Sequence, residues 1–400
     1  MPHGGAAAAR PRAVRQSNLA VVLERVRRTG PLSRSLLVSA TGLTRSAIGG
    51  LVGELVELGL VVEDAGRSDG SPGRPSPVVR VDGSRFGVLA VDIGVDELAL
   101  ALVGLDGVVV RSLRAERARD RVLLADVMAD LADVVERLGC AEPVVEGRRL
   151  TAVGIAVPGL VRRDPQAIVV APNLDWRELE VDAAVREAVG LELPVVVGND
   201  ADLGALAEST FGVRADNMVY VSGEVGVGGS VIADGTRLTG RWGFAGEFGH
   251  MPVNPDGHRC ACGASGCWET EVGERALLRR AGLAVDGGVP AVDELLRRAA
   301  AGEATALAAM AEEGRWLGIG IAALINAFDP EVVVLGALLD RILPHVRTAL
   351  EAELATRGIH GLERSVPILG ATLGRDATLV GAAELAFGSL LADPGAAAGS

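Results

Sequence analysis

The stretch at residues 243–270 reads GFAGEFGHMPVNPDGHRCACGASGCWET. Three of the chain's four cysteines lie in it, at Cys260, Cys262 and Cys267. With His250 ten positions before the first cysteine, this spacing is typical of a tetrahedral Cys3His zinc site, because structural zinc prefers thiolate and imidazole ligands. His258 is a competing fourth ligand, and a redox-active thiol cluster is the alternative. We therefore predict a structural Zn²⁺ ion held by His250, Cys260, Cys262 and Cys267.

Two glycine-containing motifs carry side chains suited to a sugar. The first is GEFGH at residues 246–250, where the Glu247 carboxylate can accept hydrogen bonds from two hydroxyls and the His250 imidazole can fix their orientation. The second is GND at residues 198–200, directly after an apolar run. Asp200 can act there as a general base toward a sugar hydroxyl, or it can cap the following helix.

From residue 86 onward, the sequence alternates between strand and helix patterns. Strands are predicted at 87–94, 98–103, 150–157, 194–197 and 331–335 and as a pair within 218–232, and helices at 123–138 and 181–189 and before residue 328. This alternation predicts an α/β fold, in which ligands collect at the carboxyl ends of strands. The glycine-rich turn at 226–230 either offers backbone amides to a phosphate or is only a hairpin.

The first 81 residues follow a different pattern. Apolar residues at helical spacing predict three short helices, with breaks at Gly30-Pro31 and at residues 41–43. N-caps are expected at Ser17 or Asn18, at Ser33 and at Thr44. This order predicts a helix-turn-helix whose third helix reads the major groove. The residues expected to contact DNA from that helix are Thr44, Arg45, Ser46 and Gly49.

A loop between predicted strands at 60–62 and 78–81 has the character of a wing. Its extended, basic segment Gly73-Arg74-Pro75 suits a narrow minor groove, and we expect Arg67 and Arg74 to contact DNA. Residues 1–80 hold 11 Arg against 6 Asp and Glu, although the whole chain has a net charge of −13. This local positive charge favours DNA binding, and a helical docking domain with a solvated loop is the alternative.

Composition indicates a globular protein of more than one unit. Of the 400 residues, 49% are hydrophobic and 23% are charged, which excludes a disordered or collagen-like chain. No charge-free apolar run approaches the roughly 20 residues of a membrane span, and the N-terminus lacks the apolar core of a secretion signal. We expect a cytoplasmic protein with no membrane partner.

On these motifs the chain resembles the ROK family of repressors and sugar kinases over nearly its whole length. The resemblance implies an actin-like ATPase (ribonuclease H-like) fold of two α/β lobes after the winged helix-turn-helix, in homodimers or homotetramers. It also implies that zinc orders the sugar-binding segment, with one nitrogen of His250 on the metal and the other facing the sugar. The implied sugar contacts are Asn199, Asp200, Glu247, His250 and Glu269, with Asn173 as a lesser candidate.

Both phosphate loops depart from the pattern of the family's kinases. The first loop reads DIGVD at residues 92–96 where the kinases carry Asp-x-Gly-Gly-Thr. In the second loop, Glu224 stands before the glycines and Ser230 replaces the last of them. The added side chains and carboxylates oppose a bound polyphosphate. Residues 336–337 read GA in place of paired glycines, which is a milder change.

These departures predict a regulator and not an enzyme. We expect a sugar-responsive DNA-binding transcriptional repressor of sugar uptake or catabolic genes, whose partners are operator DNA and a small sugar or sugar-phosphate effector. Its kinase-like fold is expected to have lost phosphoryl transfer, which leaves Asp200 as a vestigial base position. The alternative is an active ATP-dependent hexose kinase, similar to a glucokinase, with an accessory DNA-binding head.

The motifs and the resemblance together predict four segments along the chain. It comprises a flexible tail at 1–14, the winged helix-turn-helix at 15–81, the ROK sugar-binding domain at 82–390 with its zinc-stabilised segment at about 246–270, and a flexible tail at 391–400.

Overall fold

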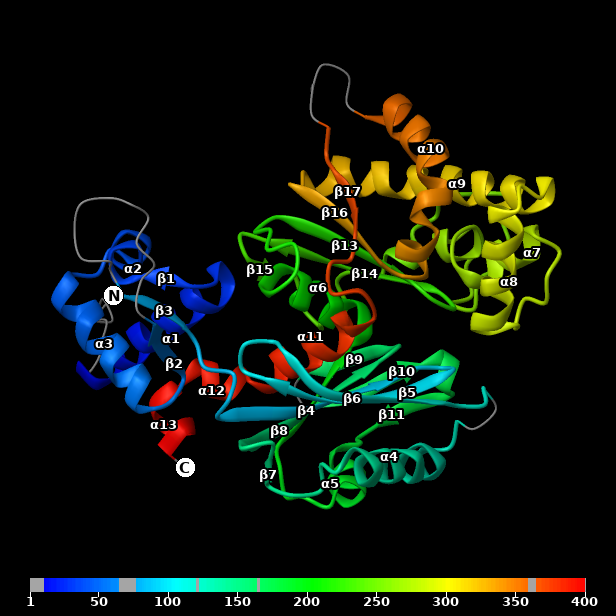
Figure 1. The fold of residues 1–400 in the computed structure, drawn as a ribbon. Helices are drawn as coiled ribbons and strands as arrows, with labels where there is room; N and C mark the ends of the chain where they lie inside the picture. Colours follow the sequence, from blue (N-terminus) through cyan, green and yellow to red (C-terminus); the bar gives the residue numbers. More distant parts are fainter. Residues whose placement is uncertain (1–10, 65–76, 120–121, 164–165, 359–364, 400) are drawn as a thin grey trace, which may run out of the picture.

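The computed structural model describes residues 11–64, 77–119, 122–163, 166–358 and 365–399. They form a small N-terminal head beside a body of two lobes, each built on a β-sheet (Figure 1). The expected α/β class is confirmed. Helices cover both faces of the larger sheet, which is why its central strands are buried along nearly their whole length.

The head is a helix-turn-helix with a three-stranded sheet. Its elements are α1 (Pro11–Thr29), β1 (Leu32–Ser33), α2 (Arg34–Thr41), α3 (Arg45–Glu57), β2 (Val61–Asp64) and β3 (Val78–Val81), with strand order β1-β3-β2. The hydroxyls of Ser33 and Thr44 cap α2 and α3, as expected. Gly42 ends α2 with φ 70°, a conformation that glycine adopts without a steric penalty. Residues 65–76, which include the expected tip of the wing, lie outside the described residues.

The first helix starts before the position expected from sequence. Within the described residues, α1 spans Pro11 to Thr29 and so already runs ahead of the caps expected at Ser17 or Asn18. Ser17 and Asn18 therefore lie inside the helix and do not cap it. Residues 11–14, expected from sequence to belong to a flexible tail, are helical in the structure.

The first lobe carries the larger sheet, in the order β12-β8-β4-β5-β6 with β7 beside β8. Its strands are β4 (Phe86–Ile93), β5 (Glu97–Gly104), β6 (Val109–Glu116), β7 (Val144–Val145), β8 (Arg148–Val157) and β12 (Val195–Asn199). Helices α4 (Leu124–Leu138) and α5 (Asp182–Val189) cover one face. A small antiparallel sheet of β9 (Leu160–Arg163), β10 (Gln166–Ala171) and β11 (Trp176–Leu179) adjoins this lobe.

The second lobe has a five-stranded sheet in the order β15-β14-β13-β16-β17. Its strands are β13 (Met218–Gly223), β14 (Val227–Ala233), β15 (Thr236–Arg237), β16 (Val332–Ala337) and β17 (Ile368–Gly370). The helices packed with it are α7 (Glu274–Arg280), α8 (Gly288–Ala300), α9 (Ala304–Phe328) and α10 (Leu338–Arg357).

Two helices lie between the sheets of the two lobes: α6 (Asp200–Thr210) and α11 (Ala377–Ala386) (Figure 1). They approach each other so closely that a Cβ on Gly381 of α11 would lie 1.9 Å from the carbonyl oxygen of Leu203 on α6. α11 also packs against β4 and β8, while α6 packs against β13 and β14. The pair therefore joins the lobes through a tightly packed contact that only a glycine permits.

The last residues of the chain are helical and contact the head. α12 (Gly388–Ala392) and α13 (Pro394–Gly399) pack against α1. Leu390 is buried in the same apolar cluster as Leu19 and Leu23 of the head. Residues 391–399, expected from sequence to belong to a flexible tail, are largely helical in the structure, and α12 and α13 contact α1.

No single helix of the described residues is both long enough and apolar enough to cross a membrane. The bent pair α2 and α3 passes that test of length and composition only when the two helices are taken together.

Candidate functional site

The cysteine-rich segment folds into one compact cluster of metal-ligand atoms. One ligand atom each from His250, Cys260, Cys262 and Cys267 lies within 4.8 Å of the others. The cluster is assembled by the short helix η2 (Phe248–His250), by η3 (Trp268–Thr270) and by the bridge between Pro252 and Cys267. His258 is exposed and outside this cluster. The donor set fits a tetrahedral zinc ion, because three sulfurs and one imidazole are a usual structural zinc shell.

The two nitrogens of His250 face different partners. Nδ1 lies 3.6 Å from Cys260 Sγ and 3.5 Å from a carboxylate oxygen of Glu269, whereas Nε2 lies 3.8 Å from Glu247 Oε2. Cys260 Sγ also donates to Glu269 Oε1 at 2.7 Å. One ring nitrogen therefore lies toward Cys260 and Glu269 and the other toward Glu247.

Asn199 and Asp200 are at the start of α6. The Asn199 side chain caps α6 by accepting from the amide of Asp202, and it donates to the carbonyl of Gly159. Asp200 accepts from the amide of Ala201 at 2.8 Å. Burial raises the pKa of Asp200 to about 7, and the nearby Asp92 carboxyl is the next cause. Asp200 is thus a half-buried carboxyl whose raised pKa lies near neutral pH.

Three carboxyls from both lobes repel one another in this region. Asp92 is on β4 and Asp200 follows β12, at the same edge of the sheet because β4, β8 and β12 run parallel. Glu224 follows β13 of the second lobe. Desolvation raises the pKa of each of the three carboxyls to about 7. For each of them, the second cause of the raised pKa is the charge of another carboxyl in this group. A polyphosphate at this position would add negative charge to an acidic region.

Asp96 of the first phosphate loop is neutralised by an arginine, which the sequence did not predict. Arg119 Nη2 lies 2.6 Å from Asp96 Oδ2 and 2.9 Å from Glu274 Oε1 on α7 of the second lobe. The negative charge of Asp96 is therefore balanced by Arg119. The same arginine bridges the two lobes beside that loop.

Ser230 in the second phosphate loop and Ala337 at the end of β16 both depart from the pattern of the kinases. Ser230 is buried and its hydroxyl donates to Asp202 Oδ1 at 2.8 Å, so it ties β14 to α6. Ala337 keeps a positive φ of 53° at the end of β16, a region that L-residues other than glycine, Asn and Asp seldom occupy. Residue 337 therefore holds a backbone conformation that glycine adopts more readily than alanine.

Replacement of Glu224 by Gln is expected to stabilise the protein more in alkaline than in acidic solution. The folded-state pKa of about 7 exceeds the ordinary value of 4.5, so the folded chain holds this proton more tightly and loses stability as pH rises through 7. Gln cannot ionise and escapes that loss. We expect a gain of about 1 kcal/mol in unfolding free energy at about pH 8, after allowing for solvent screening, and almost none at about pH 5.

Thermal or denaturant unfolding at the two pH values measures this difference. Glu57→Gln on the exposed end of α3 is the matched control and should show no pH-dependent gain. Equal gains for Glu224→Gln at both pH values would contradict a raised pKa of this carboxyl.

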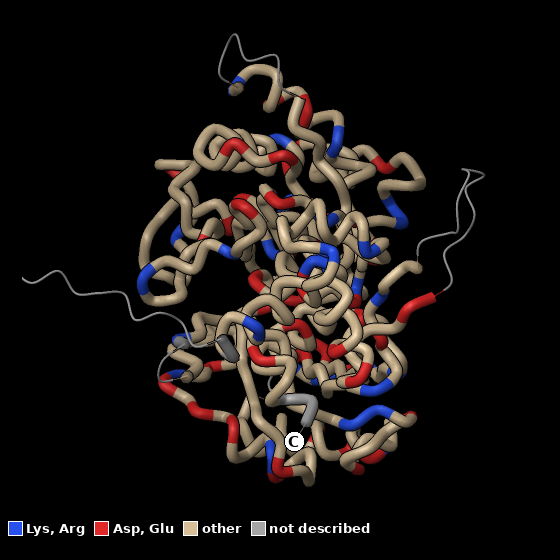
Figure 2. The backbone as a smooth tube through the Cα atoms, turned by 90° about the vertical axis from the view of Figure 1, so that its left-hand side faces the viewer, with Lys and Arg blue, Asp and Glu red and all other residues tan. Residues whose placement is uncertain are grey.

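The expected DNA-reading residues lie at the exposed start of α3. Thr44, Arg45 and Ser46 are exposed and Gly49 is half-buried. Acidic and basic positions lie next to one another over much of the backbone (Figure 2). In the head, several arginines form ion pairs with acidic residues: Arg15 with Glu54, Arg34 with Glu63 and Arg80 with Asp64. Within the described part of the chain, Arg45 has no ion pair, which leaves its guanidinium available to a phosphate or a base. Arg67 and Arg74 lie outside the described residues.

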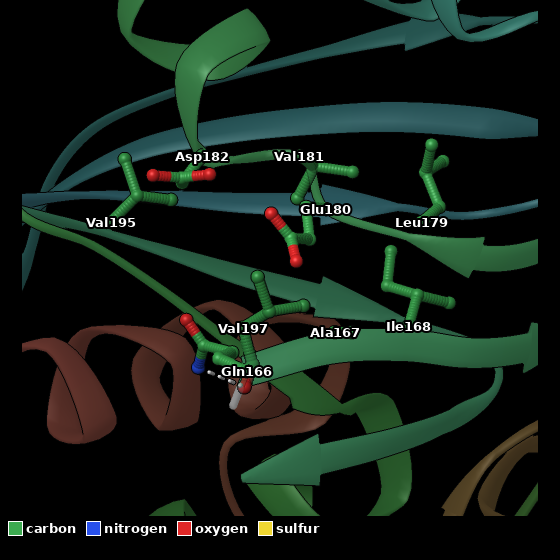
Figure 3. A pocket seen from close by; sticks show the side chains of 9 residues that line it. All are labelled: Gln166, Ala167, Ile168, Leu179, Glu180, Val181, Asp182, Val195 and Val197. Carbon is green, nitrogen blue, oxygen red and sulfur yellow. Dashed lines mark hydrogen bonds between the residues drawn. The ribbon is translucent and has the colours of Figure 1, made fainter. Parts of the chain in front are cut away.

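A separate hollow of about 210 Å³ lies in the first lobe beside β10 and β12 (Figure 3). Gln166 and Val197 line it, and the Gln166 side-chain amide donates to the Val197 carbonyl at 3.2 Å. None of the expected sugar-binding residues lines this hollow. Asn173, in η1 (Pro172–Leu174), does not line it either.

The comparisons with known proteins agree with this architecture. The ROK family model matches residues 88–388. The xylose repressor of Bacillus subtilis (strain 168) is 30% identical over 382 residues, which cover 94% of this chain and 97% of that protein. The glucokinase of Streptomyces coelicolor (strain ATCC BAA-471 / A3(2) / M145) is 32% identical over 321 residues, which cover 74% of this chain and 96% of that enzyme.

A solved structure supports the same conclusion over the whole length. The crystal structure of a ROK family transcriptional regulator, a homologue of the E. coli MLC protein, superposes with a TM-score of 0.75 at 27% identity and covers 95% of this chain and 97% of its own. The family model spans most of the body, and the repressor and this regulator also extend over the head. The chain therefore belongs to the ROK family.

Proposed function

We propose that the protein is a sugar-responsive transcriptional repressor that binds operator DNA through its head and a small sugar or sugar phosphate through its body. The observation that carries the proposal is that one chain holds both parts. It has an exposed helix-turn-helix, and it has the Glu247 carboxylate beside the His250 imidazole at the cysteine cluster. A kinase needs no DNA-reading helix, whereas a regulator needs both parts. The xylose repressor is similar over both parts, while the glucokinase aligns with only 74% of the chain.

The sugar is expected to contact Asp200, Glu247, His250 and Glu269, with Asn199 holding the start of α6. Zinc would be held by His250 and the three cysteines, and when bound it would fix the segment that presents these side chains. Cys260 must lose its proton to become a metal ligand, which removes the donor that Glu269 now accepts from. Both oxygens of Glu269 would then be available to accept a hydrogen bond from a sugar hydroxyl.

Phosphoryl transfer is proposed to be lost. Asp92, Asp200 and Glu224 place negative charge around the two former phosphate loops, and the Arg119 ion pair with Asp96 occupies the first of them. One observation favours the kinase alternative: Asp200 keeps the base position, with a pKa of about 7 that suits proton abstraction from a hydroxyl. An assay of sugar phosphorylation with ATP and magnesium separates the two.

Selection of genomic DNA by the purified protein tests the proposal. Fragments retained at physiological salt are sequenced, and the selection is repeated with a panel of sugars. We expect a few sites beside sugar uptake or catabolic genes, released by one sugar. Arg45→Ala should lower affinity for those sites by about tenfold, the effect of roughly 1.4 kcal/mol for a base or phosphate contact.

The matched control for Arg45→Ala is Arg25→Ala, an exposed arginine on α1 away from the reading helix. Enrichment of no site over non-specific DNA by the wild-type protein would reject DNA recognition by the head. Equal losses of DNA affinity in the two variants would instead mean that Arg45 contributes only its positive charge and makes no specific contact.

A further inference from the structure

We propose that Arg27 and Arg28, neighbours near the end of α1, transmit the relative position of the two lobes to the DNA-binding head. This inference rests on the proposed function, since it concerns how sugar binding in the body alters operator binding by the head. Both residues belong to the head, yet their guanidinium groups bind the body.

Arg27 holds the first lobe and the helices between the lobes. Its side chain has no exposed surface, and Nη1 donates to Glu384 Oε1 of α11 at 2.8 Å while Nη2 pairs with the second oxygen of the same carboxylate. Nε donates to the carbonyl of Leu105, just after β5, at 3.3 Å. The guanidinium carbon lies 5.2 Å from the ring centre of Phe211. A buried, bidentate and stacked arginine has one geometry, so α1 cannot shift at this point without breaking these contacts.

Arg28 holds the second lobe. Its Nη2 donates to Asp216 Oδ1 at 2.6 Å and its Nη1 donates to the carbonyl of Gly235 at 2.7 Å. Asp216 precedes β13, and Gly235 lies in the turn between β14 and β15. Adjacent residues of one helix therefore bind two different lobes, and a rotation of one lobe against the other must either break a contact or turn α1.

Helix α6 provides the connection back to the sugar residues. Asp200 is its first residue and Phe211 follows its last turn, so its 11 residues, a length of roughly 16 Å, run from the expected sugar site to the ring beneath Arg27. Asp202 of the same helix binds Ser230 on β14 and pairs with Arg237 on β15. A displacement at the start of α6 is therefore carried to the head by a helix that is also tied to the second lobe.

These contacts define a two-state element of the kind that allosteric coupling requires. α1 carries apolar residues of the head's own core, including Leu19, Leu23 and Val26. When α1 turns, the reading helix α3 packed on it turns as well. A sugar that favours one lobe arrangement then favours one head orientation, and operator affinity changes by the same factor as sugar affinity changes on DNA.

The test measures the coupling factor, which is the ratio of operator dissociation constants with and without saturating sugar. It uses the full chain, the operator and the sugar found in the selection above. In Arg28→Ala we expect sugar affinity and sugar-free operator affinity to stay within threefold of wild type, while the coupling factor falls at least tenfold toward one. Arg28→Lys should restore part of the coupling, since it retains a donor and the charge. Arg25→Ala, exposed on the same helix, should keep the wild-type factor.

A variant of the buried pair provides a second measurement. Glu384→Gln keeps the shape of the partner of Arg27 and should also reduce the coupling factor, and a thermal melt shows whether the variant is folded. If the wild-type protein responds to sugar, and the folded variants Arg28→Ala and Glu384→Gln respond as strongly as wild type, this inference is wrong and the proposed function stands. If wild type binds the operator with no response to any sugar, the sugar-responsive function fails and this inference fails with it.

Discussion

Cys262→Ser is expected to release the bound metal and to abolish the response to sugar while operator binding persists. Cys262 Sγ lies 3.6 Å from Cys267 Sγ within the four-residue cluster, and a serine hydroxyl is a poor substitute for a thiolate on zinc. Without the metal, the thiols and His250 no longer share one ion that fixes them together, so we expect Glu247 and Glu269 to lose their fixed arrangement. We expect zinc content to fall from about one equivalent per chain to almost none.

Metal analysis and operator binding with and without sugar measure the two effects. Cys140→Ala is the matched control, because Cys140 is buried in the first lobe away from the cluster and its replacement should leave the metal in place. His258→Ala should also keep the metal, since His258 lies outside the cluster. Stoichiometric zinc in Cys262→Ser, or its loss in His258→Ala, would show that the ligand set is different.

Asp200→Asn is expected to weaken sugar binding by 10- to 100-fold at about pH 8. An ionised carboxylate accepts stronger hydrogen bonds from hydroxyls than an amide does, and the loss of a charge-assisted bond of 1.4–3 kcal/mol corresponds to that factor. The raised pKa of about 7 means that Asp200 is increasingly protonated below neutral pH, and Asn resembles the protonated carboxyl more closely. The difference from wild type should therefore shrink at about pH 6.

Calorimetric titration with sugar at the two pH values measures this effect. Asp182→Asn, at the start of α5 on the other face of the first-lobe sheet, is the control and should bind sugar as wild type does. A pH-independent loss in Asp200→Asn would contradict a raised pKa. If the wild-type protein turns over ATP and Asp200→Asn abolishes that turnover, the protein is a kinase. The proposal that phosphoryl transfer is lost would then be wrong.

Local chemistry explains why much of the fold was predictable from sequence. Ser33, Gly42 and Thr44 act within one or two turns of chain, so the helix-turn-helix follows from caps and a left-handed glycine. The strands that were predicted in the two lobes (β4, β5, β8, β12, β13, β14 and β16) are apolar runs, and the structure places them within a few residues of the predicted positions, whereas strands such as β6 and β9 to β11 were not predicted. The cysteine cluster was predictable because its ligands lie close together in sequence.

Contacts between residues far apart in sequence were not predictable. Arg27 and Glu384 are separated by 357 positions, and no local pattern pairs them. The link from Arg119 to Asp96 and Glu274 likewise depends on how the lobes meet. The segment 391–399 is rich in alanine and glycine, so its helicity depends on packing against α1 and leaves little periodic signal. The expected sugar and DNA contacts stay predictions, because they concern molecules other than this chain.

The position of α11 and α12 has a consequence for how the protein is made. These helices cover one face of the first-lobe sheet and support the head, yet they belong to residues 377–392, far beyond the strands and helices that they join. During synthesis, the head and the first-lobe strands leave the ribosome long before these helices do. The nascent chain therefore holds an unfinished sheet face and an undocked head until residue 390 emerges, and the head reaches its docked position only after that point.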